Sequence, residues 1–176
     1  DRKGREHLQN CLSIVFQDYT TSANPRFTIQ QVIAEGIAIG ERTTGEKVRY
    51  ADETVRLLEL VGLDGSFARR FPHELSGGQL QRVCIARAIA CKSKLILFDE
   101  AVSSLDAHTQ VQIMDLLLEL KAKLGLTYIF ITHDLTSITY FCSRVIFLKD
   151  GIVVADSPVK DLSKLDVPYA RELLGA

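Results

Sequence analysis

The chain has 176 residues, 47% of them hydrophobic, and its 21 lysines and arginines nearly balance its 22 aspartates and glutamates. This length fits one domain or the larger part of one, and the apolar content excludes a disordered chain. The balanced charge disfavours a nucleic-acid-binding surface, and the longest apolar runs are too short to cross a bilayer. No signal peptide opens the sequence, so we expect any membrane role to come from docking to another protein.

The cysteines are too scattered to form a metal site. Cys11, Cys84, Cys91 and Cys142 form no Cys-x-x-Cys pair and no cluster with histidine. We therefore expect reduced, mostly buried thiols rather than zinc ligands or a redox switch.

Apolar periodicity predicts one strand and three helices in the first half of the chain. The strand is expected over Leu12–Phe16. Glycines and capping residues set the expected ends of the helices, so that Gly40 and Gly62 close the first two. The first two helices are expected over 29–40 and 48–62, and the third follows the Ser76-Gly77-Gly78 turn and runs to about Cys91.

The second half alternates strands with helices, which predicts an α/β fold with a mostly parallel sheet. Continuous apolar runs at Leu95–Phe98 and Thr127–Ile131 indicate strands covered on both faces. A helix is expected after each strand, over 113–124 and 135–141.

A hairpin and a short helix are predicted after these elements. Asp150-Gly151 is a strong turn signal between strands at 144–148 and 152–155. Ser157 and Pro158 then resemble an N-cap followed by proline in the first turn of a short helix.

Two adjacent carboxylates, Asp99 and Glu100, follow an apolar strand. Strand ends at the carboxyl edge of an open α/β sheet are where such folds bind ligands. One acid can hold Mg²⁺, and the other can orient or deprotonate an attacking water. The alternative is an ordinary strand end with two acids in a loop, and the pair by itself does not decide between them.

Ser76, Gly77, Gly78 and Gln79 open a predicted helix. Glycines let backbone N–H groups approach an anion, and the helix dipole favours negative charge at the same place. The spacing of Ser76 and Gln79 also matches a capping box, so a capped helix without a ligand is the alternative.

Three further polar residues lie at strand or helix ends. His133 follows the strand at 127–131, where a histidine can contact a terminal phosphate or position water. Gln17 follows the first strand, where its carbonyl can ligate Mg²⁺, and Asp106 is placed to cap a helix. Each has an ordinary structural alternative, either a residue satisfied in a loop or a simple cap.

The order of these motifs resembles the ATP-binding-cassette (ABC) ATPases. In that family's terms, the matches are Gln17 for the Q-loop glutamine, Leu75–Gln79 for the signature motif, Leu95–Asp99 for Walker B, Glu100 for the catalytic glutamate, Ser103–Asp106 for the D-loop and His133 for the switch histidine. The resemblance covers nearly the whole chain. It implies ATP and Mg²⁺ as cofactors, with Mg²⁺ on Asp99 and Gln17 and catalysis by Glu100 and His133.

The family's P-loop is missing from these residues. The stretch Gly40–Lys47 has the glycine spacing, but Glu46 stands where lysine is required and no apolar strand precedes it. We interpret it as a loop between helices. The expected fold is therefore a P-loop NTPase-like nucleotide-binding domain without its P-loop strand and helix, which should expose apolar surface at Leu95–Phe98 or its neighbours.

The resemblance also implies an architecture. It consists of a mostly parallel sheet with helices on both faces, a helical signature subdomain at 19–92, a core from Walker B to the switch histidine at 93–155, and a helical tail at 156–176. Family members pair head to tail, so the signature motif of this chain would serve its partner's ATP. We expect this chain alone to be an inactive fragment that binds ATP very weakly and either aggregates or stays partly molten.

Phe16-Gln17-Asp18, Asn24–Ile29 and the Ala101-Val102 pair resemble the oligopeptide, dipeptide and nickel importer group, and the last pair resembles the second ATPase subunit of nickel importers. This implies uptake of nickel or a related metal chelate, with peptide import as the alternative. The implied partners are a sister ATPase, two permeases and an extracytoplasmic binding protein, at the cytoplasmic face of the inner membrane.

Two other ATPase classes and a non-catalytic subunit fit less well. A DNA-repair ATPase would carry long coiled coils, and a ribosome-associated factor would carry two cassettes. Glu100 and His133 indicate a working ATPase as the parent rather than a structural subunit.

Overall fold

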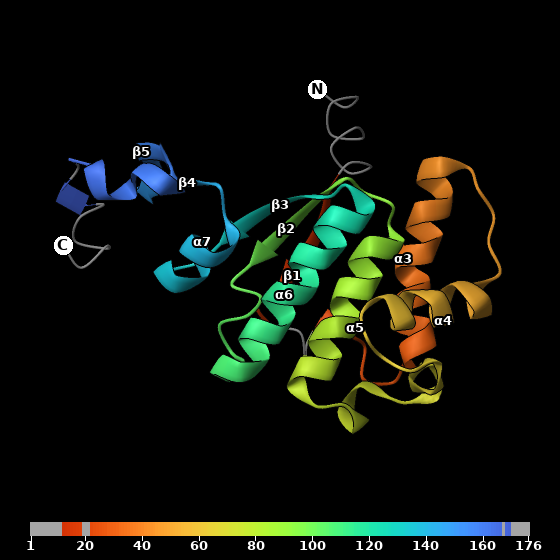
Figure 1. Cartoon of the computed structure of the whole chain (residues 1–176). Helices are drawn as coiled ribbons and strands as arrows, with labels where there is room; N and C mark the ends of the chain where they lie inside the picture. The colour runs from red at the N-terminus through yellow and green to blue at the C-terminus, as the bar shows by residue number, and fades with distance from the viewer. Residues whose placement is uncertain (1–11, 19–21, 167, 170–176) are drawn as a thin grey trace. The chain divides into compact units, whose positions relative to one another are not determined.

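The computed structural model describes residues 12–18, 22–166 and 168–169 (Figure 1). The chain divides into two compact units, residues 1–131 and 132–176, which are described separately below. His7 and Cys11 lie outside the described residues, Cys84 is buried, and Cys91 and Cys142 are partly buried. None of the described helices is long and apolar enough to span a bilayer.

A three-stranded parallel sheet forms the centre of the first unit. It consists of β1 (Leu12–Phe16), β2 (Leu95–Asp99) and β3 (Thr127–Ile131), in the order β1-β2-β3. Phe16 pairs with Asp99, which pairs with Ile131, so the three strands end at one level. The predicted strands and the parallel α/β class are confirmed.

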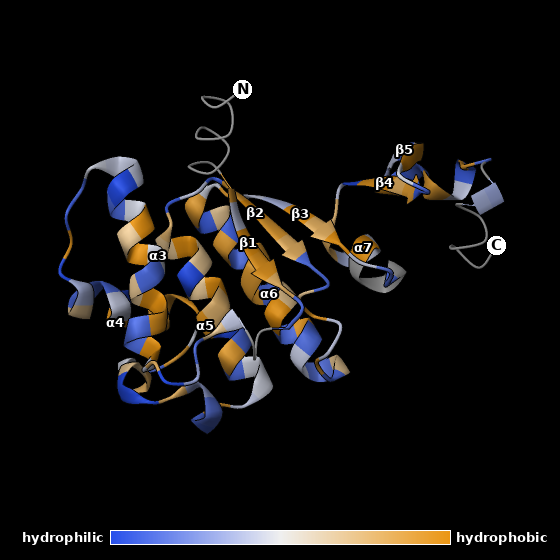
Figure 2. Cartoon of the chain, turned by 180° about the vertical axis from the view of Figure 1, so that it is seen from behind, coloured by the Kyte–Doolittle hydropathy of each residue, from blue (hydrophilic) through white to orange (hydrophobic). Residues whose placement is uncertain are grey.

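In the described part of this unit, four α-helices and two short 3₁₀ helices accompany the sheet. They are α3 (Ile29–Thr44), α4 (Tyr50–Leu60), η1 (Gly65–Arg69), η2 (Pro72–Glu74), α5 (Gly77–Ala90) and α6 (Ala107–Leu124). Figures 1 and 2 place α5 and α6 on one side of the sheet. The Ser13 hydroxyl on β1 donates to the Ala88 carbonyl of α5 at 3.0 Å, which ties the first strand to that helix.

The two faces of the sheet differ in burial. On the face toward α5 and α6, Val15, Ile96 and Phe98 are at most 1% exposed. The other face, which we call the open face, carries apolar side chains that are 38–50% exposed, namely Ile14, Phe16, Ile129 and Ile131.

The open face corrects one prediction and confirms another. The strands are not covered on both faces, and within the described part of the first unit the helices pack on one side only. A continuous apolar run shows that a strand can be buried on both faces, and the rest of the chain decides whether it is. The expectation of exposed apolar surface next to Leu95–Phe98 is confirmed.

The pairing of α3 with α5 explains a second correction. The predicted helix stop at Gly40 is wrong, because α3 continues to Thr44 and ends at Gly45, whose φ is 77°. A Cβ atom on Gly36 would lie 2.2 Å from the Arg87 carbonyl oxygen, and one on Gly40 would lie 2.3 Å from that of Ala90. These glycines therefore permit close helix packing and do not end the helix.

The stretch with P-loop-like glycine spacing is the end of α3 and the connection to α4. The Glu41 carboxylate accepts hydrogen bonds from Lys47 Nζ, the Val48 backbone N–H and the Tyr50 hydroxyl, at 3.0, 3.0 and 3.3 Å. These bonds, with that of the Val48 backbone first in importance, lower the pKa of Glu41. The Glu41 carboxylate thus binds groups in the connection that follows α3, and the stretch is a loop between two helices, as predicted.

The second unit holds α7 (Leu135–Phe141) and an antiparallel hairpin of β4 (Arg144–Lys149) and β5 (Ile152–Pro158). Asp150 and Gly151 adopt φ of 51° and 78°, which confirms the predicted turn. The predicted N-cap at Ser157 is wrong, because β5 extends through Pro158 and the 3₁₀ helix η3 (Val159–Lys164) begins one residue later.

Candidate nucleotide site

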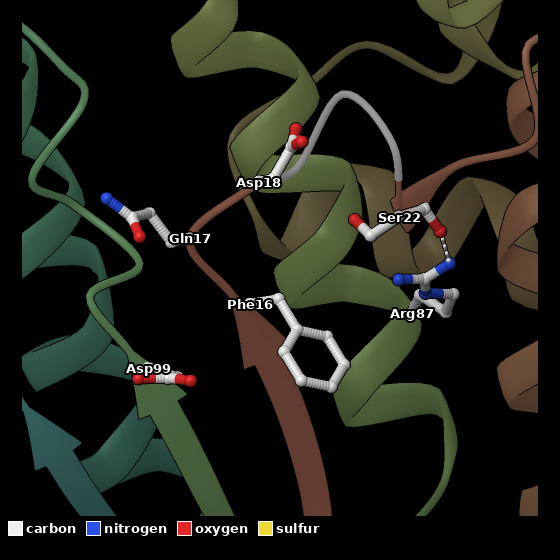
Figure 3. Close-up of a pocket in the computed structure, with 6 residues that line it drawn as sticks. All are labelled: Phe16, Gln17, Asp18, Ser22, Arg87 and Asp99. Atoms are coloured by element: carbon white, nitrogen blue, oxygen red, sulfur yellow. Dashed lines mark hydrogen bonds between the residues drawn. The ribbon is translucent and has the colours of Figure 1, made fainter.

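A pocket lies where β1 and β2 end. The register pairs Phe16 with Asp99, so Gln17 emerges from its strand beside the Asp99 carboxylate. A cavity of about 450 Å³ opens there (Figure 3). Its lining combines an aromatic ring with carboxylate, amide, hydroxyl and guanidinium groups, from Phe16, Gln17, Asp18, Ser22, Arg87 and Asp99. The structure thus brings together two of the predicted ligands, Gln17 and Asp99.

A hydrogen-bond chain joins Gln17 to the segment after β2. The Gln17 amide nitrogen donates to the Ser103 hydroxyl at 3.3 Å, and that hydroxyl donates to the Glu100 carbonyl at 2.9 Å. Because the nitrogen is engaged by Ser103, the Gln17 amide oxygen is directed to the side of Asp99 (Figure 3). Gln17 is therefore oriented by a residue whose contribution the sequence pattern did not indicate.

Glu100 has an unusual backbone. Its φ is 46°, in the left-handed region that few non-glycine residues occupy, and its N–H donates to the Ile131 carbonyl at 2.9 Å. Such strain persists where surrounding bonds enforce it, and it concentrates at functional sites. The second acid of the pair is thus held in place by β3 on one side and by Ser103 on the other.

Arg87 is a pocket residue that the sequence reasoning missed. From α5 its guanidinium donates to the Ser22 carbonyl at 2.6 Å and lies 3.5 Å from the Glu35 carboxylate of α3. Figure 3 shows this arginine beside Ser22 at the edge of the pocket. A lone arginine in a helix usually indicates a solvated side chain, so nothing in the spacing distinguished it.

The Ser76–Gln79 turn is a complete capping box. The Gln79 N–H donates to the Ser76 hydroxyl at 3.3 Å, and the Ser76 N–H donates to the Gln79 side-chain oxygen at 3.0 Å. The cap interpretation is confirmed, and a ligand role for Ser76, Gly77, Gly78 and Gln79 stays a prediction. The Ser76 side chain is exposed and so remains open to a second contact.

Asp106 caps α6, as the sequence indicated. Its carboxylate accepts from the Thr109 hydroxyl at 2.6 Å and from the Thr109 N–H at 3.0 Å. These bonds, with that from the hydroxyl first, lower the pKa of Asp106. His133 belongs to the second unit, so its predicted contact with a terminal phosphate stays a prediction.

The family model described as "ABC transporter" matches residues 1–103, more than half of the chain. The chain belongs to the ABC transporter family. Gln17, Asp99 and Ser103, which the structure brings to one edge of the sheet, all lie within the matched residues.

Curated ABC relatives include import proteins for several cargoes. The metal-staphylopine import ATP-binding protein CntF of Staphylococcus aureus is 42% identical over 98% of this chain and 68% of its own length. The nickel import ATP-binding protein NikE of Rhodospirillum rubrum is 41% identical over 94% and 59%, and the oligopeptide transport ATP-binding protein OppF of Bacillus subtilis is 40% identical over 99% and 58%. The chain thus spans about three-fifths to two-thirds of the length of these relatives.

Solved ABC structures share the fold. A dimeric, post-hydrolysis structure of the cassette MJ0796 bound to ADP and phosphate has a TM-score of 0.72 and 30% identity, over 90% of this chain and 67% of that one. The cbiO1 protein from Clostridium perfringens, part of the transporter complex cbiONQ, has a TM-score of 0.78 and 26% identity, over 100% and 72%. These likenesses confirm the predicted α/β nucleotide-binding fold.

The pocket's donor set suits Mg²⁺, which prefers a few carboxylate and carbonyl oxygens together with water and phosphate. Asp99 and the oriented amide oxygen of Gln17 provide two such ligands. Among the described residues no group of three or more His, Cys, Asp or Glu could hold a metal without further ligands. The donor set therefore fits an ion whose remaining ligands are phosphate oxygens and water.

Proposed function

We propose that the chain is the ATP-hydrolysing subunit of an ABC importer. The observation that supports this proposal is the arrangement of residues at the carboxyl edge of the sheet. There Gln17 and Asp99 line one pocket, and Ser103 links the Gln17 side chain to the backbone of Glu100. Asp99 and Gln17 would hold Mg²⁺, which would neutralise phosphate charge. Glu100 would orient or deprotonate the attacking water, and His133 would contact the terminal phosphate.

The signature turn would act on a second nucleotide. In a head-to-tail pair, Ser76, Gly77, Gly78 and Gln79 would face ATP held by the sister subunit, with Asp106 nearby. The exposed Ser76 and the N-terminus of α5 support this role, because backbone N–H groups and the helix dipole favour phosphate there.

Substitution at Ser76 tests the shared site. We expect Ser76→Arg, in a complex with a sister subunit whose P-loop is intact, to reduce ATP hydrolysis at least tenfold, because it fills the space of the phosphate with a long side chain. Ser66→Arg changes another exposed serine that caps no α-helix and should leave the rate unchanged. Equal rates for the two variants would contradict the shared site.

The cargo that we propose is nickel or a related metal chelate. The metal-staphylopine and nickel relatives support it, and the oligopeptide relative supports peptide import as the alternative. The partners would be a sister ATPase, two permeases and an extracytoplasmic binding protein, with this subunit peripheral to the cytoplasmic face of the inner membrane.

Uptake measurements separate the two cargoes. Cells that lack this chain would be compared with complemented cells for accumulation of radiolabelled nickel and of a radiolabelled dipeptide. A loss of nickel uptake that is restored by the wild-type chain and not by Glu100→Gln supports the metal assignment. Selective loss of dipeptide uptake supports the alternative.

The isolated chain should bind ATP weakly and associate with itself. The missing P-loop removes the main phosphate contacts, and the apolar open face offers a surface for aggregation. Equilibrium dialysis with labelled ATP and light scattering measure both properties. Tight ATP binding by a monodisperse sample would contradict this expectation.

A further inference from the structure

Gly78 lies against Thr109 of α6, and the contact leaves no room for a larger side chain. A Cβ atom at position 78 would lie 2.6 Å from the Thr109 Cγ2 methyl and 3.9 Å from its Cβ. Carbon atoms that are not bonded approach to about 3.5–4.0 Å. The second residue of α5 therefore packs directly on the first turn of α6.

Thr109 is held in this position. Its N–H and its hydroxyl bind the two different carboxylate oxygens of Asp106, at 3.0 and 2.6 Å. A rotation about χ1 that removed the methyl from Gly78 would also move the hydroxyl away from Asp106. The methyl therefore cannot give way without loss of the hydroxyl's bond to Asp106, one of the two bonds that join this threonine to the cap of α6.

The backbone of Gly78 does not itself require glycine. Among the described residues the glycines with positive φ are Gly45, Gly62, Gly125 and Gly151. Gly78 lies in a helix, where alanine is more favourable than glycine. The missing side chain at position 78 is thus explained by space, and the space is occupied by Thr109.

We propose that Thr109 is a positioning residue. Its methyl occupies the space left by the missing side chain of Gly78 and so holds the signature turn, Ser76–Gln79, against the start of α6, where Asp106 is the N-cap. The turn at Ser76–Gln79 and the segment that ends at Asp106 are then one rigid body. A shift of either segment is transmitted to the other through a methyl contact and a carboxylate cap. The effect on ATP hydrolysis rests on the proposed function, whereas the packing itself does not.

A double-substitution cycle on the full 176-residue chain tests the packing. Urea midpoints followed by pulse proteolysis compare the wild type, Gly78→Ala, Thr109→Ser and the combined variant. Thr109→Ser deletes the methyl and keeps the hydroxyl that binds Asp106. We expect Gly78→Ala to raise the unfolding equilibrium constant about tenfold in the wild-type background, and to leave it unchanged or lower it in the Thr109→Ser background.

A matched control separates rescue from a general effect of serine. Thr43 also lies in a helix, and its hydroxyl bonds to the Ile39 carbonyl of α3 at 3.0 Å. Thr43→Ser should not rescue Gly78→Ala. If Gly78→Ala stabilises the chain equally with threonine or serine at position 109, or if Thr43→Ser rescues as well, the packing proposal is overturned.

ATP hydrolysis by the assembled transporter tests the positioning role. Gly78→Ala should lower the rate about tenfold, and addition of Thr109→Ser should recover most of that loss. Loss of activity with unchanged stability and no rescue would mean that Gly78 serves only the approach of a nucleotide, and it would overturn the proposal. If the wild-type assembly hydrolyses no ATP, the proposed function fails while the urea cycle still decides the packing.

Discussion

The helical block of α3, α4 and α5 and the sheet of β1–β3 belong to one unit but are enclosed to different degrees. In the block, Ile33, Leu57 and Ile85 are fully buried, and glycines let the backbones of α3 and α5 approach each other closely. The sheet is buried on one face and leaves half of the Phe16 side chain exposed on the other. Apolar sequence therefore indicates what can be buried, and packing partners decide what is.

The largest contrast should come from two phenylalanines on opposite faces of the sheet. Phe98 is fully buried and stacks on Phe130 at 4.7 Å between ring centroids. Phe98→Ala should lower the free energy of unfolding by about 4 kcal/mol, because it removes a large ring and leaves a cavity. Phe16→Ala should cost less than about 1 kcal/mol. Similar losses for both in urea unfolding would show that the open face is covered in solution.

Two glycines test how tightly the helical block is packed. Gly36→Ala places a methyl against the Arg87 carbonyl and should cost about 2 kcal/mol, since backbone cannot give way easily. Gly65→Ala is the control, because its Cβ would meet only the Val55 side chain, at 3.0 Å, and that valine is partly exposed. Thermal unfolding should show a clear loss for the first variant and little change for the second.

The smallest expected effect is a pH dependence inside the block. Arg56 binds the Glu53 carboxylate at 2.6 and 2.7 Å and, with help from Lys92, lowers the pKa of Glu53 below its ordinary value of 4.5. The stabilisation is thus present above that value and is lost as the pH falls through the lowered pKa.

Glu53→Gln should therefore cost less than about 1 kcal/mol at pH 7 and should reduce the loss of stability between about pH 5 and pH 3. Urea midpoints across this range measure the slope. Glu59→Gln, on an exposed position of the same helix, is the matched control. An unchanged slope in the Glu53 variant would show that its ion pair is not formed in solution.

The strand ends were the most predictable part of the site. Apolar strands followed by Gln17 and Asp99 place these residues at one edge once the strands are parallel, and the sheet register bears this out. The capping residues Ser76 and Asp106 were equally accessible, because caps depend on neighbours within three positions.

The rest depends on contacts between distant segments. Gly40 signals a helix end when it is considered alone, and only α5 reveals why the helix continues. Arg87 and Thr109 carry no local signal, since their contacts lie 65 and 31 positions away, at Ser22 and Gly78. Sequence patterns locate groups on elements, whereas packing decides which groups meet.

The left-handed backbone of Glu100 has a consequence for any attempt to improve this chain. Glycine or asparagine would occupy that conformation with less strain, so a screen that rewards thermostability alone would favour replacing the glutamate. The more robust variants from such a screen would lack the carboxylate that we propose for hydrolysis. At this one position, higher thermal stability would be gained at the expense of the proposed ATP hydrolysis.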